Sequence, residues 1–123
     1  MPRKNYTMYL KSWRTWIFLS YISLVIYLSL TPGGELGWFL KLWKYDKVVH
    51  FGEYLVMGFL MINMLMIQPL KQAHWKFALI FLFFFPIIDE LLQFYTPTRI
   101  PDIYDGIFDL CGGYIGAYIR KII

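Results

Sequence analysis

Long apolar runs constrain this chain more than any other feature of its sequence. Four such runs occupy positions 16–31, 48–67, 76–95 and 103–119 of the 123 residues. A helix that crosses the hydrocarbon of a bilayer needs about 20 mostly apolar residues. With 59% hydrophobic and 16% charged residues, a soluble domain of this size would expose too much apolar surface. The runs therefore predict an all-α integral membrane protein, with four transmembrane helices in a compact bundle that forms a single domain over residues 1–123.

Two regions depart from a simple pattern of four crossings. The last run is interrupted by Asp105, Asp109 and several glycines. The connection at positions 32–47 places Trp, Tyr, Phe and Leu between lysines, a composition typical of the head-group region of a bilayer. We expect this connection to include an interfacial segment between the first and second helices.

The basic residues predict the orientation of the bundle. Most of them lie before the first run, in the second loop or at the C-terminus: Arg3, Lys4, Lys11, Arg14, Lys71, Lys76, Arg120 and Lys121. By the positive-inside rule the two termini and the second loop are cytoplasmic, and the first and third loops face outward. The same dispersion argues against a nucleic-acid partner despite the net charge of +4, because no basic stripe or binding motif is present.

Acidic residues inside the apolar runs indicate a polar site. An ionisable side chain in hydrocarbon costs several kcal/mol unless it faces the bundle interior, pairs with another group or serves a function. Helical spacing brings polar residues of the last three runs to the outward ends of their helices: Asp46, His50 and Tyr54; Glu90 and Gln93; Asp105 and Asp109. We therefore expect an outward-facing polar pocket, with Lys47 and Arg99 at its rim.

Three motifs in this region resemble those of the VanZ-like family. The first is D-K-x-x-H-F at positions 46–51, the second is E-x-x-Q at 90–93 with a P-x-R downstream, and the third begins at Asp105 and ends in glycines. Asp109 stands where the family pattern has Asn. An ionised Asp only accepts hydrogen bonds, whereas Asn also donates them, so the charge of this pocket differs from the family pattern.

The resemblance implies a multi-pass protein of the bacterial cell membrane. The founding type of the VanZ-like family is associated with resistance to the glycopeptide antibiotic teicoplanin. The resemblance implies a class of protein and a set of residues, and it does not imply a reaction.

We expect the pocket to bind or modify the head group of an anionic lipid or cell-envelope precursor. The candidate acid–base residues are His50, Glu90, Asp105 and Asp46, and the candidate binding residues are Lys47, Arg99, Tyr54, Gln93 and Asp109. A divalent cation bound mainly by carboxylates is a further option, because oxygen ligands suit Mg²⁺, Mn²⁺ or Ca²⁺. Whether the protein is an enzyme stays open.

Two other interpretations stay open at this stage. In one, the polar cluster is a structural network or partner-binding element of a non-enzymatic membrane protein. In the other, the protein is a small ion or proton transporter, which polar residues confined to the outer half support poorly. Gly112 and Gly116 form a G-x-x-x-G pair, typical of close helix packing within a chain or across a homodimer.

Overall fold

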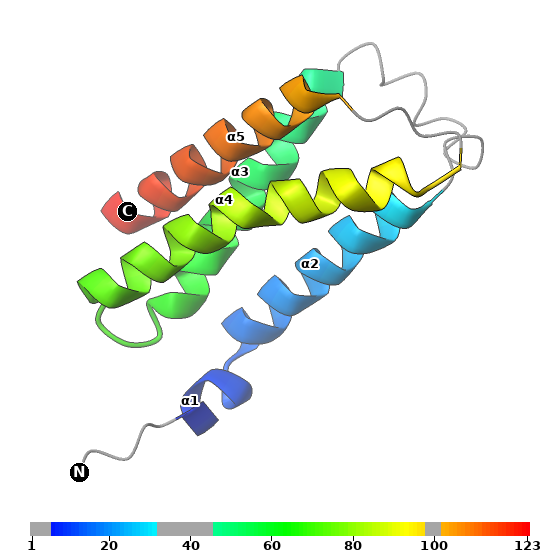
Figure 1. The fold of residues 1–123 in the computed structure, drawn as a ribbon. Helices are drawn as coiled ribbons and strands as arrows, with labels where there is room; N and C mark the ends of the chain where they lie inside the picture. The colour runs from blue at the N-terminus through cyan, green and yellow to red at the C-terminus, as the bar shows by residue number, and fades with distance from the viewer. Residues whose placement is uncertain (1–5, 32–45, 98–101) are drawn as a thin grey trace.

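The described residues of the chain form five helices. The computed structural model describes residues 6–31, 46–97 and 102–123, with only the backbone of Asp46 (Figure 1). The helices are α1 Tyr6–Lys11, α2 Trp13–Leu30, α3 Asp46–Leu65, α4 Gln72–Phe94 and α5 Ile103–Ile122. No strand occurs in these ranges, which confirms the all-α prediction. Helices α2 to α5 run in alternating directions, so α1 and the C-terminus lie at the same end of the bundle.

Helices α2, α3 and α4 begin before the apolar runs that predicted them and end one or two residues before those runs end. Helix α2 begins earlier because the Ser12 side chain caps it, accepting a hydrogen bond from the Arg14 backbone N–H at 3.3 Å. At the start of α4 the Lys71 backbone N–H donates to Nδ1 of His74, also at 3.3 Å. Polar residues therefore form the beginnings of both helices, and a search for apolar runs does not detect them. Hydropathy also misses the short helix α1, which contains no long apolar run.

Three helices are long and apolar enough to cross a membrane, and α5 is not among them. The three spans are Trp13–Leu30, Lys47–Leu65 and Gln72–Phe94. Helix α5 has sufficient length, but it carries Asp105 and Asp109 near its start and Arg120 and Lys121 in its last turn. These charges and its glycines lower its hydropathy. Three of the four predicted helices therefore have the length and composition for a crossing, and a fourth crossing by α5 stays a prediction.

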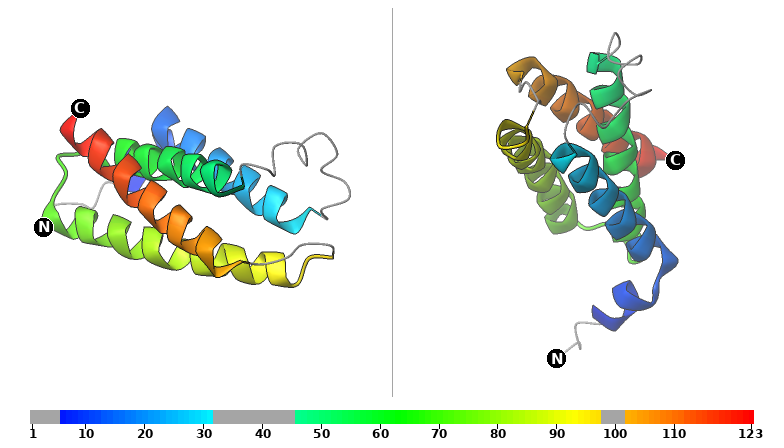
Figure 2. Two further views of the ribbon diagram at one scale, coloured as in Figure 1. Left: turned by 90° about the horizontal axis from the view of Figure 1, so that it is seen from above. Right: turned by 90° about the vertical axis from the view of Figure 1, so that its right-hand side faces the viewer.

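Helix α5 packs most extensively against α3, and glycines allow the close approach (Figure 2). A Cβ atom on Gly116 would lie 1.9 Å from the Leu55 carbonyl oxygen, and one on Gly58 would lie 2.0 Å from the Gly113 carbonyl oxygen. Gly112 meets the backbone of α3 in the same way. Gly112 and Gly116 thus serve packing within the chain. A homodimer stays a prediction, and it would need a surface other than these two glycines.

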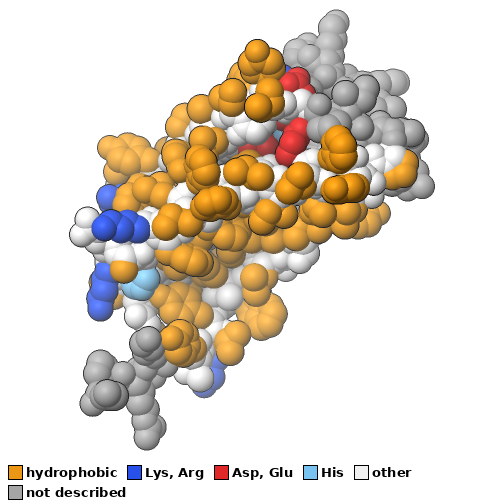
Figure 3. Space-filling view, in the orientation of Figure 1, with side chains coloured by type: hydrophobic (Ala, Val, Ile, Leu, Met, Phe, Trp, Pro, Cys, Tyr) orange, Lys and Arg blue, Asp and Glu red, His pale blue; other side chains and the backbone are white. Residues whose placement is uncertain are grey.

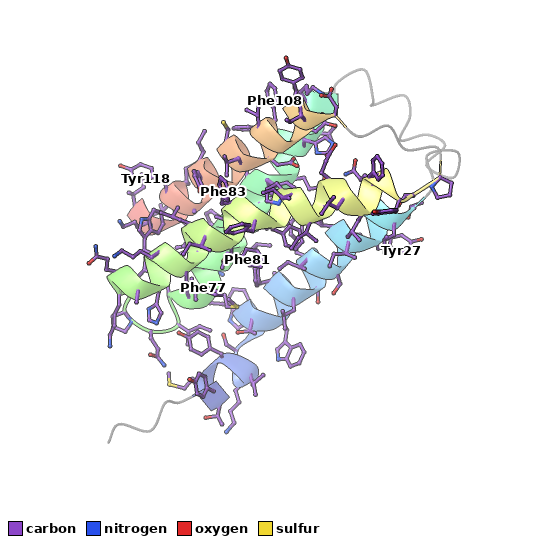
Figure 4. All side chains as sticks on the ribbon, in the orientation of Figure 1. Tyr27, Phe77, Phe81, Phe83, Phe108 and Tyr118 are labelled. Carbon is purple, nitrogen blue, oxygen red and sulfur yellow. The ribbon has the colours of Figure 1, made fainter. Side chains whose placement is uncertain are left out.

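The interior between the two ends of the bundle is apolar. Met57, Met61 and Leu82 are at most 1% exposed. Phe81 stacks on Phe85 at a centroid distance of 5.2 Å. Many aromatic side chains instead project outward from the bundle, among them Phe77, Phe83, Phe108, Tyr118 and Tyr27 (Figure 4). An apolar exterior around an apolar interior is what hydrocarbon surroundings require.

Candidate functional site

Acidic side chains gather at one end of the bundle, where α3 and α5 begin and α4 ends. Figure 3 shows them among apolar side chains at the start of α5, while Lys and Arg side chains lie at the opposite end of the same face. The alternating helix directions produce this arrangement, since the N-terminal turns of α3 and α5 meet the C-terminal turns of α4. We call the side chains of Lys47, His50, Glu90, Asp102, Asp105 and Asp109 the polar cluster.

Lys47 joins α3 to the start of α5. Its Nζ donates hydrogen bonds to Asp102 Oδ2 at 2.7 Å and to Asp105 Oδ1. Asp102 also caps α5 by accepting from the Tyr104 backbone N–H at 2.9 Å. The hydrogen bond from Lys47, followed by the one from Tyr104, lowers the pKa of the Asp102 carboxyl. The charge of Lys47 is thereby balanced by two carboxylates.

His50 is buried between two carboxylates of α5. Its Nδ1 lies 2.9 Å from Asp109 Oδ1, and its Nε2 lies 3.5 Å from Asp105 Oδ2. His50 is 9% exposed, Asp105 is 3% and Asp109 is 1%. The tautomer of His50 decides the direction of this hydrogen bond. With Asp109 ionised, and therefore only an acceptor, Nδ1 carries the proton that binds Asp109. Asp109 thus orients the ring, and the other nitrogen faces Asp105, an arrangement suited to proton transfer.

Glu90 approaches the same cluster from α4. His50 and Asp105 are close enough to act on it electrostatically, and the Asp102 backbone N–H donates to its carboxylate. Its Oε1 atom is buried and has no hydrogen-bond partner within the described part of the chain. A buried acceptor without a donor is uncommon in folded proteins and calls for an explanation.

Asp89 forms a second buried group that the spacing argument did not single out. Its Oδ2 accepts a hydrogen bond from the Tyr54 hydroxyl at 2.8 Å, and its Oδ1 pairs with the Ser29 hydroxyl. Asp89 is 2% exposed and links α4 to both α3 and α2. Gln93, one turn farther along α4, is buried at the same end. The signal was present in the sequence, because Asp89 is an acid within an apolar run and faces about 100° away from Glu90.

The structure brings most of the predicted residues together at one end. His50, Lys47, Glu90, Asp105 and Asp109 form the polar cluster, while the hydroxyl of Tyr54 is engaged by Asp89. Other predictions fall on parts of the chain that are not described. These are Arg99, the Asp46 side chain and nearly all of the expected interfacial segment at 32–47. Their roles, including a pairing of Asp46 with His50, stay predictions.

The described ranges contain no preformed binding site for a divalent cation. No group of three or more His, Cys, Asp or Glu residues within 6–31, 46–97 and 102–123 is arranged to hold a metal ion. The ammonium group of Lys47 lies between Asp102 and Asp105 instead. A lysine there supplies the positive charge that a cation would provide. The proposed cation therefore gains no support from these residues.

The fold and the cluster define a multi-pass helical membrane protein with charged groups concentrated at one end of its bundle. A family model described as VanZ/LLP1 matches residues 3–123. The chain therefore belongs to the VanZ/LLP1 family, as its motifs indicated. No curated protein and no solved structure matches it.

Proposed function

We propose that the polar cluster binds the head group of a membrane lipid or lipid-linked cell-envelope precursor and acts on it as an acid–base centre. One observation carries the proposal, namely that His50 is held between Asp105 and Asp109 at the end of the bundle. A buried ion-pair network can often be replaced by packed apolar side chains without loss of stability. Stability alone is therefore a weak reason for this concentration of charge.

The proposed roles follow from what each group touches. Asp109 is a positioning residue, because it fixes the His50 ring through Nδ1. His50 would take up or release a proton on a bound head group, and Asp105 or Glu90 would serve as the second acid–base group. These roles require only groups that already lie within one small region.

Recognition of an anionic head group depends on Lys47 and, from the sequence, Arg99. Lys47 already pairs with two carboxylates, so an anionic ligand would have to displace one of them. The rest of the described cluster is rich in acceptors, namely the oxygens of Glu90, Asp102, Asp105 and Asp109. A head group that carries both a negative charge and hydrogen-bond donors would match this mixture.

We further propose that α5 crosses the membrane with the other three helices and that the polar cluster faces outward, following the positive-inside rule. Cysteine labelling tests the orientation in a Cys111→Ala background, since Cys111 is exposed. Gly34→Cys should react with an impermeant reagent added to intact cells, and Lys71→Cys should not. The reverse pattern contradicts the orientation.

An outward-facing site offers a link to glycopeptide susceptibility, because glycopeptides act outside the cell membrane. The test uses His50→Gln, Glu90→Gln, Asp105→Asn and Arg99→Lys, with membrane yield and thermal stability measured beside teicoplanin susceptibility. His74→Gln, at the opposite end, is the matched control. We expect the four variants to lose any change in susceptibility that the parent protein confers, at normal protein levels. Retention of that change by all four variants refutes the functional site.

Two alternatives are kept as outcomes of these experiments. A structural network predicts that the four variants lose thermal stability together with the phenotype. Transport is less well supported, because the described interior between the two ends is apolar at Met57, Met61 and Leu82. A proton path needs polar groups or water across that distance.

A further inference from the structure

An apolar groove between α4 and α5 leads to the polar cluster. It has a volume of about 360 Å³, and its lining includes Pro86, Ile87, Glu90, Gly106 and Ile107. Ile87 and Ile107 are about half exposed on the outer surface of the bundle. Because α4 is long and apolar enough to cross the membrane, this groove opens sideways towards lipid.

Glu90 distinguishes the groove from an ordinary lipid-facing surface. Among the described residues that line the groove, it is the one ionisable side chain, and the others are apolar apart from a glycine. Its Oε1 is buried and has no hydrogen-bond donor among the residues that the structure describes. An acceptor left without a partner beside hydrocarbon is unfavourable, and a ligand that donates a hydrogen bond would relieve this cost.

The helix geometry leaves room for such a ligand. A Cβ atom on Gly106 would meet nothing within 4 Å, whereas one on Gly112 or Gly116 would collide with the backbone of α3. Gly106 is thus not required for packing, and its missing side chain keeps the groove open beside Glu90.

We infer that the groove binds the hydrocarbon chain of a lipid whose head group donates a hydrogen bond to Glu90 from a hydroxyl or ammonium group. The hydrocarbon part lies against Pro86, Ile87 and Ile107, and the donor reaches the carboxylate of Glu90. His50 and Asp105 are close enough to that carboxylate to act on it electrostatically. The inference rests on the proposed function and adds the class of ligand and its lateral route from the bilayer.

Lipid binding to the purified full chain tests this inference. Native mass spectrometry compares phosphatidylglycerol, phosphatidylethanolamine and phosphatidylcholine with identical acyl chains. The first donates from hydroxyls and the second from an ammonium, whereas the quaternary ammonium of the third has no N–H. We expect at least one of the two donors to bind about tenfold more tightly than phosphatidylcholine, the scale of one good hydrogen bond. Equal binding of all three overturns the inference.

Two variants separate the head-group contact from the groove. Glu90→Leu should abolish the preference for donor lipids. Because it also removes the acceptor of the Asp102 backbone N–H, thermal stability is measured beside lipid binding. Gly106→Leu should fill the groove and weaken binding of all three lipids. Gly52→Leu is the matched control, since a Cβ there also meets nothing within 4 Å and Gly52 does not line the groove. If Gly106→Leu and Gly52→Leu bind lipid alike, the groove is not the site.

The outcome is distinguishable from failure of the proposed function. Unchanged lipid binding in Gly106→Leu, together with loss of phenotype in His50→Gln, removes the groove and leaves the acid–base proposal standing. Selective lipid binding by the parent protein, together with an unchanged susceptibility phenotype in the cluster variants, supports the groove and refutes the acid–base proposal.

Discussion

The two halves of the α3–α5 interface are built in different ways. Near the start of α5 the helices meet through charged side chains, as in the contacts of His50 with Asp105 and Asp109. Farther along, they meet through glycines such as Gly58 and Gly116, whose backbones approach closely. The change occurs within one turn, between Asp109 and Gly112.

This difference separates the contacts that hold α3 and α5 together from the charged contacts of the polar cluster. Close glycine packing associates helices in hydrocarbon through van der Waals contact, with no charge to desolvate. The charged half has to offset the cost of removing ions from water before it contributes any stability. Substitutions in the glycine half should therefore affect folding most, and conservative substitutions in the charged half should affect folding less.

The largest expected effect comes from adding a side chain in the glycine half. Gly116→Val places atoms against the Leu55 carbonyl and should lower the free energy of unfolding by about 3 kcal/mol or more. Thermal unfolding in detergent and membrane yield measure it. Gly52→Ala is the control and should change stability by no more than about 1 kcal/mol. Equal stability of the two variants would mean that α3 and α5 do not pack as described.

A smaller loss of stability is expected at Asp109, and its size depends on hydrogen bonding. Asp109→Leu leaves the buried Nδ1–H of His50 without this acceptor and should cost about 2 kcal/mol. Asp109→Asn keeps an acceptor oxygen and should cost less than about 1 kcal/mol. Chemical denaturation of both variants tests the ranking. If Asn is as damaging as Leu, the negative charge of Asp109 matters more than its hydrogen bond.

The Asp89 group should respond more weakly to a conservative change. Asp89→Asn keeps one acceptor oxygen for two hydroxyl donors, so one of the two bonds weakens, at a cost of about 1 kcal/mol. A double-mutant cycle with Tyr54→Phe isolates the Asp89–Tyr54 bond. Strictly additive stability losses would show that this bond contributes nothing.

The smallest effect concerns the partly exposed pair of Lys47 and Asp102. Because the pKa of Asp102 is lowered in the folded protein, its contribution to stability is present above the unfolded pKa and lost as pH falls through the folded pKa. The melting temperatures of the parent and Asp102→Asn should therefore differ at about pH 6 and converge towards about pH 3. A difference that persists at low pH excludes this charge interaction as its source.

The sequence determined the four long helices and the end of the bundle at which the polar residues lie. Apolar runs predict α2, α3 and α4 because a bilayer requires long apolar helices. Polar residues at the helix beginnings change only where the helices start. Alternating helix directions and helical spacing together placed His50, Glu90 and Asp105 at one level. Both arguments use only the geometry of a single helix and the thickness of the membrane.

Only the tertiary structure decided which helix faces which, and with that the pairing of side chains. The spacing of residues along α3 determines the face of the helix on which His50 lies. The rotation of α5 about its own axis determines that Asp109 lies next to Nδ1 of His50 and Asp105 next to Nε2. The rotation of α4 likewise directs Asp89 inward to Tyr54 and leaves Glu90 at the groove. Such rotations depend on packing between segments distant in the sequence, here on glycines that let α5 approach α3, and the spacing within one helix does not contain that information.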